Sequence, residues 1–123
     1  MILVDTSVWV DHLRRGDAAL ADALQQGQVA MHPFVVGELA CGSLRDRAEL
    51  LGLLQALPAL TVATYEEVLH FIEAHALMGR GLGYVDVHLL AAARLADTLL
   101  WTRDKRLASM AADMQIAYAE IRH

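Results

Sequence analysis

Residues 1–10 read MILVDTSVWV, and this opening stretch sets the architecture that we predict for the chain. Ile2 to Val4 are apolar and short enough to form a strand that is buried on both faces. Asp5 follows as the only formal charge among these residues, and a helical pattern begins directly after it. Open parallel sheets bind ligands outside the carboxyl ends of their strands. The stretch therefore predicts a buried strand that ends in a candidate functional carboxylate.

Apolar segments elsewhere in the chain extend this strand to a sheet. Residues 29–31 and 99–101 are similarly short and free of charge, and residues 60–62 and 116–118 are weaker strand candidates. Helical patterns lie between these segments. Because strands that alternate with helices form parallel sheets covered on both faces, we expect an α/β fold, a three-layer α/β/α sandwich around a central parallel sheet of about five strands. We expect a single domain over residues 1–123.

Local signals place the predicted helices. Thr64 and Glu67 form a capping box for a helix that is expected to stop near residues 78–79. Asp17 is expected to cap a helix that ends at Gly27. Further helices are predicted to open at Pro33 and to extend over 84–96 and over 105–112. Another is lined by Leu50, Leu51, Leu54 and Leu57 and ends before Pro58. In the helix over 84–96, one face is expected to be buried, and it consists of Val85, Leu89, Ala92 and Ala96.

The composition favours a folded cytoplasmic protein. Hydrophobic residues make up 56% of the chain and charged residues 20%, which argues against disorder and predicts a subunit interface that buries surplus apolar surface. No apolar run approaches the ~20 residues that cross a membrane, and the first residues lack the pattern of a secretory signal. The single cysteine, Cys41, excludes an internal disulfide and a cysteine zinc site, and we expect it to be a small buried hydrophobe.

Three carboxylates stand alone among apolar or small residues. Asp5 is the only charged residue in 1–10, Glu38 in 33–44 and Asp86 in 82–93. A carboxylate in such surroundings loses hydration, so it persists when it is protonated, hydrogen-bonded, paired with a cation or bound to a metal. Asp104 follows the strand over 99–101 by three residues, which places it at the same sheet edge as Asp5. We expect all four acids to converge on one rim.

Each acid also has a purely structural explanation. Asp5 and Asp104 could cap helices, Asp86 could complement a helix dipole, and Glu38 could pair with a buried arginine. Clustered carboxylates, however, repel one another unless a divalent cation lies between them. Hard oxygen ligands without a histidine or thiolate set select Mg²⁺ or Mn²⁺, which can activate water for the hydrolysis of phosphate esters. The four acids therefore predict a site for metal-dependent phosphate-ester chemistry.

The net charge of −5 argues against a nucleic-acid partner that is held by a bulk positive field. The four candidate acids are part of the fifteen acidic residues, so ten basic residues face only eleven other acids. Several of the remaining basic residues flank the predicted rim and are free to contact a phosphate backbone, although a solvated face with ordinary ion pairs is the structural alternative for them. These residues include Arg14, Arg15, Arg45, Arg47, Arg80, Arg103, Lys105 and Arg106. The sequence assigns no such contact to any one of them.

The acids and their neighbours resemble the PIN-domain ribonucleases. The matching motifs are LVDTSVW (3–9), VGEL (36–39), GYVD (83–86) and WTRD (101–104), in the order and spacing of that family. The resemblance covers essentially the whole chain. Within the family, the short length is similar to that of the VapC toxins of bacterial and archaeal toxin–antitoxin pairs.

The resemblance implies an enzyme that hydrolyses RNA phosphodiester bonds. Its site would consist of Asp5, Glu38, Asp86 and Asp104 around Mg²⁺ or Mn²⁺, as catalytic and metal-binding residues. The hydroxyls of Thr6 and Thr102 match positions that often support this acidic site. The resemblance further implies a homodimer, and a small antitoxin protein that covers the cleft and suppresses cleavage.

Competing interpretations remain at this stage. A catalytically inert PIN-like module would keep the fold and the dimer and use the acids as caps or partner contacts. A haloacid dehalogenase-like phosphatase would need a second aspartate at the position of Ser7. The six histidines include no His-x-x-x-His pair, so we interpret them as surface or packing residues, and we expect Trp9 and Trp101 in the core.

Overall fold

The strand β1 (Ile2–Val4) lies at the centre of a parallel sheet. The computed structural model describes residues 1–120 and pairs β1 with β2 (Val29–Ala30) on one side and β3 (Leu99–Trp101) on the other. Ile2 is in register with Val29 and with Leu99. All three residues of β1 are buried, as predicted for a strand covered on both faces.

The sheet has three strands within residues 1–120, so the expected number of about five was too high. The two weaker candidate segments form only isolated parallel bridges, between Met31 and Ala59 and between Leu100 and Ala117. Each bridge consists of two backbone hydrogen bonds around one residue. Pro58, which has no N–H to donate to a strand, directly precedes Ala59, and the cap of the next helix follows at Thr64.

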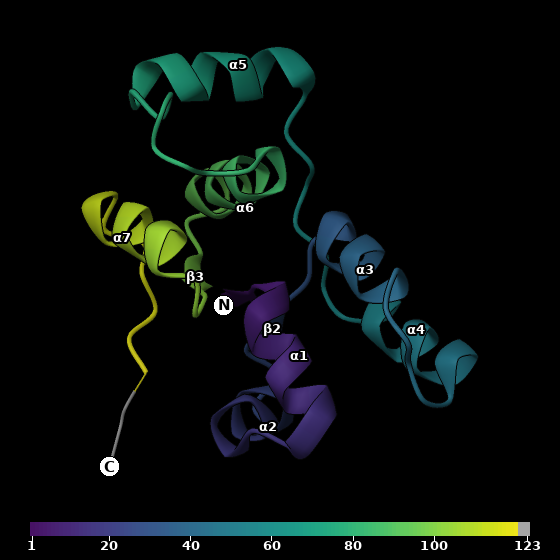
Figure 1. Cartoon of the computed structure of the whole chain (residues 1–123). Helices are drawn as coiled ribbons and strands as arrows, with labels where there is room; N and C mark the ends of the chain where they lie inside the picture. The colour runs from purple at the N-terminus through teal and green to yellow at the C-terminus, as the bar shows by residue number, and fades with distance from the viewer. Residues whose placement is uncertain (121–123) are drawn as a thin grey trace.

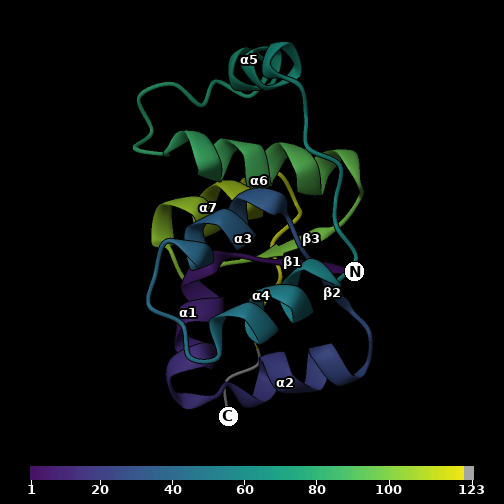
Figure 2. The same ribbon diagram turned by 90° about the vertical axis from the view of Figure 1, so that its right-hand side faces the viewer.

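Seven helices within residues 1–120 surround the sheet and complete the three-layer α/β/α sandwich. Helices α5 and α6 lie on one face, and α1 and α2 lie on the other (Figures 1 and 2). Helices α3 and α4 lie on the β2 side, and α7 lies beside β3 (Figure 1). The helix bounds are α1 (Thr6–Arg15), α2 (Ala18–Gln25), α3 (Pro33–Ala40), α4 (Arg47–Gln55), α5 (Tyr65–Ala74), α6 (Tyr84–Leu95) and α7 (Lys105–Asp113).

The predicted helix caps are confirmed, whereas one predicted helix end is not. Thr64 and Glu67 form the capping box of α5, and Asp17 accepts a hydrogen bond from the backbone N–H of Leu20 at the start of α2. Helix α5 ends at Ala74, several residues before the predicted stop. The chain leaves the helix there because Ala76 adopts a left-handed conformation with φ of 51°.

Burial in the core follows the sequence pattern in most places. Trp9 and Trp101 are buried, as predicted. Helix α6 is buried continuously from Val87 to Ala93 rather than on one face, because it lies between the sheet and α5 (Figure 1). Cys41 is exposed beyond the end of α3, so the prediction of a buried position was wrong. No helix among residues 1–120 has both the length and the apolar character needed to span a membrane.

His32 is a buried polar residue that joins β2 to α3. Its side chain is fully buried, and its Nδ1 accepts a hydrogen bond from the backbone N–H of Phe34, which caps the helix. Its Nε2 is buried without a hydrogen-bond partner within residues 1–120. Burial, together with repulsion from His88, lowers the pKa of His32 to about 4. The folded protein therefore holds this ring in its neutral form.

We predict that this ring makes the fold sensitive to mild acid. The pKa of histidine in the unfolded chain is about 6.5, so protonation of the unfolded state lowers the free energy of unfolding as the pH falls from there to about 4. The full effect is up to about 3 kcal/mol. His32→Asn keeps a capping acceptor and removes the titration, so urea denaturation at several pH values should give a flatter pH dependence.

The exposed His70 on α5 supplies the control for this experiment. His70→Asn should keep the pH dependence of the parent protein. An equally steep pH dependence in His32→Asn and the parent protein would contradict the assignment.

Candidate active site

Asp5 occupies the carboxyl end of the central strand and is itself buried. Its backbone N–H donates to the carbonyl of Trp101, which fixes it against the end of β3 at 2.9 Å. Its Oδ2 accepts hydrogen bonds from the hydroxyl of Thr102 at 2.7 Å and from that of Ser7 at 2.9 Å. Although Asp5 precedes α1, its side chain makes no capping bond to that helix. The cap explanation for Asp5 is therefore wrong, and two hydroxyls orient its carboxylate instead.

Glu38 is joined to this region through a hydroxyl group. The Thr6 hydroxyl donates to Oε1 of Glu38 at 2.6 Å and so links the start of α1 to α3. Glu38 is exposed and forms no ion pair among residues 1–120, so the alternative of a buried arginine partner is wrong. Thr6 therefore holds one oxygen of Glu38 at the edge of the site.

Asp86 lies in the first turn of α6 and is partly buried. Its Oδ2 accepts a hydrogen bond from the backbone N–H of Gly83 at 2.9 Å, which closes the turn before the helix. Burial raises the pKa of Asp86 above its ordinary value, and the charges of Asp5 and Asp104 raise it further, against the opposing effect of the Gly83 bond. The carboxylates of Asp5 and Asp104 are thus close enough to Asp86 to disfavour its ionised form.

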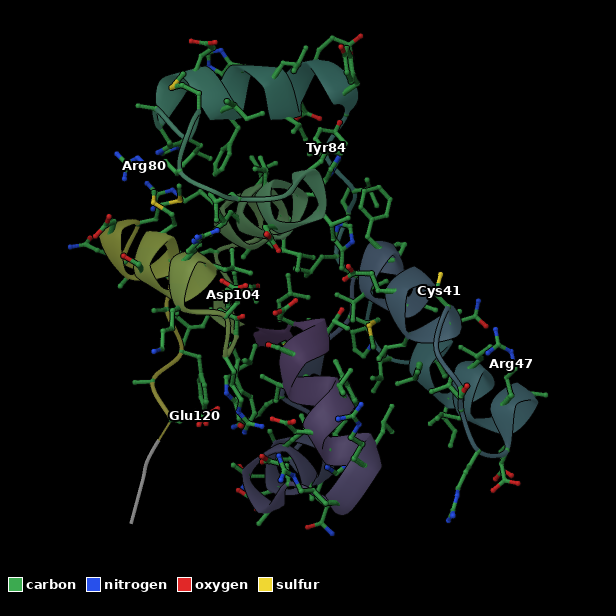
Figure 3. All side chains as sticks on the ribbon, in the orientation of Figure 1. Cys41, Arg47, Arg80, Tyr84, Asp104 and Glu120 are labelled. Atoms are coloured by element: carbon green, nitrogen blue, oxygen red, sulfur yellow. The ribbon has the colours of Figure 1, made fainter. Side chains whose placement is uncertain are left out.

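Asp104 combines a structural role with a place at the site. Its Oδ1 accepts hydrogen bonds from the backbone N–H groups of Arg106 and Leu107, at 2.9 and 3.0 Å, so the cap explanation is correct for this oxygen. Its own N–H donates to the hydroxyl of Thr102 at 3.1 Å. Figure 3 shows Asp104 at the start of α7. One hydroxyl, that of Thr102, therefore contacts both Asp5 and Asp104.

In each of the four acids, the two carboxylate oxygens differ in their hydrogen bonding. One oxygen of each carboxylate is anchored by a hydroxyl or a backbone N–H. The other oxygen accepts no hydrogen bond from residues 1–120, and no acid of the set forms an ion pair with a residue in that range. The oxygens without partners are Oδ1 of Asp5, Oε2 of Glu38, Oδ1 of Asp86 and Oδ2 of Asp104.

The structure brings only part of this set of four acids close together. Asp86 lies within electrostatic reach of both Asp5 and Asp104, whereas Glu38 is connected to Thr6 by a hydrogen bond. Over the described residues, no three histidine, cysteine, aspartate or glutamate side chains already stand close enough to ligate one ion. The donor set still has the chemistry that suits Mg²⁺ or Mn²⁺, because it consists of hard carboxylate oxygens under mutual repulsion.

The profile of the PIN domain matches residues 2–113. The chain is 47% identical over 121 residues to Ribonuclease VapC32 of Mycobacterium tuberculosis, which covers 98% of each protein. The chain belongs to the PIN-domain family. The family resemblance inferred from the four sequence motifs is therefore confirmed.

Solved structures of low sequence identity share the PIN-domain fold. A toxin–antitoxin complex from Klebsiella pneumoniae matches with a TM-score of 0.68 and 21% identity, over 89% of this chain and 92% of that one. PAE2754 from Pyrobaculum aerophilum matches with a TM-score of 0.63 and 18% identity, over 88% and 82% of the two chains. These likenesses establish that the arrangement of helices and strands is that of the PIN domain.

Sequence reasoning missed the contribution of Ser7 to this PIN domain. The Ser7 hydroxyl donates to Oδ2 of Asp5 and accepts from the backbone N–H of Arg103 at 3.0 Å, so it ties α1 to the segment after β3. The signal was its position two residues after Asp5, within reach of that carboxylate. Arg103 was expected to flank the rim, but it forms ion pairs with Asp11, Asp17 and Glu120 instead.

We predict that Asp86→Asn stabilises the metal-free PIN domain. The amide oxygen can still accept from Gly83, while the buried charge that repels Asp5 and Asp104 is removed. The free energy of unfolding at neutral pH should rise by up to about 1 kcal/mol. Because the raised pKa lets Asp86 become neutral in acid, the advantage of the variant should shrink as the pH falls through that pKa.

Chemical denaturation in EDTA measures this effect. Asp97→Asn removes the same charge from an exposed turn after α6, where asparagine tolerates the φ of 51°, and it should leave stability unchanged. A loss of stability in Asp86→Asn, or an equal gain in both variants, would contradict repulsion among the acids.

Proposed function

We propose that the protein is a metal-dependent ribonuclease that hydrolyses RNA phosphodiester bonds as the toxin of a toxin–antitoxin pair. The observation that carries this proposal is the set of unpaired carboxylate oxygens at the carboxyl ends of β1 and β3. The 47% identity to Ribonuclease VapC32 along nearly the whole chain supports RNA as the substrate. Since cellular RNA is the proposed substrate, we place the activity in the cytoplasm.

The residues that would hold the metal are Asp5, Glu38, Asp86 and Asp104, with Mg²⁺ or Mn²⁺ as the ion. When bound, such an ion supplies an activated water and neutralises charge on a phosphodiester. The chain's own residues orient the carboxylates. Thr102 and Ser7 hold Oδ2 of Asp5, so that its Oδ1 faces no competing donor among residues 1–120. Thr6 does the same for Glu38, which supports the assignment of Thr6 and Thr102 as supporting residues.

A small antitoxin is the proposed protein partner. The fold neighbour from Klebsiella pneumoniae is a toxin–antitoxin complex, which supports a partner of this kind. Beside the acids, a groove of about 510 Å³ runs between α1, α3 and α4. Glu38 and Arg14 line it together with the apolar side chains of Val10, Leu13 and Leu39. A partner seated in this groove would cover Glu38 and could thereby block access to the acids.

We also propose that the protein forms a homodimer. Large apolar side chains are exposed on α5, α6 and the start of β3, where a monomer would leave them in water. Burial of apolar surface of this kind is the driving force for association. The exposed residues are Tyr65, Leu69, Tyr84, Leu95 and Leu99.

The decisive variant for the enzymatic proposal is Asp5→Asn. Asparagine keeps an acceptor for Thr102 and Ser7 but removes the negative charge that a cation requires. We expect cleavage of single-stranded RNA in Mg²⁺ or Mn²⁺ to fall by at least about a thousandfold, a loss comparable to removal of a key electrostatic group in an active site. Binding of Mn²⁺, followed by isothermal titration calorimetry, should weaken in parallel.

Asp97→Asn, which lies in the exposed turn after α6, should cleave RNA and bind Mn²⁺ like the parent protein. Metal-dependent cleavage that survives in Asp5→Asn would show that the site is elsewhere. A parent protein that neither cleaves RNA nor binds Mn²⁺ would favour the inert PIN-like module.

A further inference from the structure

Three basic side chains line a second pocket, which lies beside the four acids but is not lined by any of them. Arg80, Lys105 and Arg106 surround a shallow depression of about 260 Å³, together with Ser109 and Met110 of α7. All three basic residues are exposed, and none forms an ion pair within residues 1–120. Arg103, by contrast, forms ion pairs with three acids. The three residues form a positively charged cluster on a protein whose net charge is −5.

The two arginines of this cluster are held in place by specific contacts. An added Cβ at Gly81 would lie 2.8 Å from Nη1 of Arg106 and 3.1 Å from its Cδ. The guanidinium of Arg106 therefore packs against the backbone of Gly81, and a side chain at this position would displace it. Nη1 of Arg80 donates to Sδ of Met110 at 3.5 Å. Two like charges are thus kept near each other without a counterion from residues 1–120.

The cluster adjoins the acids through two short segments. The loop that carries Arg80 ends at Gly83, whose N–H is bound by Asp86. Lys105 and Arg106 directly follow Asp104 at the start of α7, and Figure 3 shows Arg80 beside this helix. The first N–H groups of α7 are already bound by Asp104, so an anion here would be recognised by side chains and not by the helix terminus.

We propose that Arg80, Lys105 and Arg106 form a subsite for the phosphodiester backbone of RNA that flanks the cleavage site. Guanidinium groups bind phosphate oxygens through paired N–H donors, and a phosphate backbone supplies anions at regular intervals. An RNA strand whose scissile phosphate lies at the acids extends beyond them and needs cations for its neighbouring phosphates. The inference rests on the proposed ribonuclease function and assigns part of its substrate contact to one face.

Binding measurements on the double variant Arg80→Gln/Arg106→Gln test the subsite. A fluorescent single-stranded RNA of randomised sequence is titrated in Mg²⁺ at several salt concentrations, with Asp5→Asn in every protein to suppress cleavage. Loss of two phosphate contacts should reduce the slope of log affinity against log salt by about 1.4, and weaken binding at low salt by on the order of tenfold. With Asp5 intact, the double variant should raise KM and leave kcat within about twofold, because uniform binding is lost.

A matched control removes the same number of positive charges from two other helices. Arg15 lies at the far end of α1 and Arg94 near the end of α6, so Arg15→Gln/Arg94→Gln should keep the salt dependence of the parent protein. Equal salt slopes and affinities in the two double variants would overturn the subsite. If polyglutamate binds as tightly as RNA and loses affinity in the same variant, the cluster recognises an acidic protein, which also overturns it.

Two glycine substitutions test the placement of Arg106 without changing charge. Gly79 and Gly81 both have left-handed backbones, with φ of 71° and 77°, so alanine strains both positions similarly. An added Cβ at Gly79 meets nothing within 4 Å, whereas one at Gly81 displaces Arg106. We expect Gly81→Ala, but not Gly79→Ala, to weaken RNA binding several-fold in proteins with equal circular dichroism. Unchanged RNA affinity in both would contradict the assignment.

Failure of this inference is distinguishable from failure of the proposed function. If the parent protein cleaves RNA in an Asp5-dependent manner while both double variants bind alike, only the subsite is wrong. If the parent protein does not cleave RNA, the ribonuclease proposal itself is wrong.

Discussion

Repulsion among Asp5, Asp86 and Asp104 is the constraint around which the site is built. Parallel pairing of β1 with β3 brings the carboxyl ends of both strands to one edge, so the residues that follow them must meet there. Helix α6 then adds Asp86, whose pKa is raised by burial and by the two other charges. Uncompensated carboxylates in a cluster destabilise the folded state. Such clusters are typical of sites in which the charges bind a ligand. Anchoring one oxygen of each acid while leaving the other without a hydrogen bond fits this purpose.

The arrangement of the basic residues complements that of the acids. Arg103 is neutralised by Asp11, Asp17 and Glu120, so the arginine nearest in sequence to Asp104 is withdrawn from the carboxylates. Its ion pairs join α1, the start of α2 and the segment after β3, which gives it a structural role. The cluster of Arg80, Lys105 and Arg106 has no such partners among residues 1–120 and adjoins the acids. A phosphodiester strand would thus meet acids that can hold a cation and, next to them, cations that can hold phosphate.

Much of this arrangement was predictable from local sequence, and what was missed depends on long-range contacts. The strand before Asp5 and the capping box at Thr64 have strong local signals, and both were confirmed. The edge segments around residues 59 and 117 form one bridge each rather than strands, and their pairing with Met31 and Leu100 depends on contacts between segments that are distant in the sequence. Two of the three partners of Arg103, Asp11 and Asp17, lie 92 and 86 positions away, and no periodicity indicates such a pairing. Ser7 was within reach of Asp5 in sequence, but its second bond, from the N–H of Arg103, depends on the folded sheet edge.

The unpaired carboxylate oxygens are expected to form one cation site. Crystals soaked in Mn²⁺ and measured at the manganese absorption edge reveal its position, because the anomalous signal locates the ion independently of activity. We expect an anomalous peak between the side chains of Asp5, Asp86 and Asp104, with Glu38 at its border. A fully soaked crystal with no peak among these side chains, or with the only ordered Mn²⁺ elsewhere on the molecule, would contradict it.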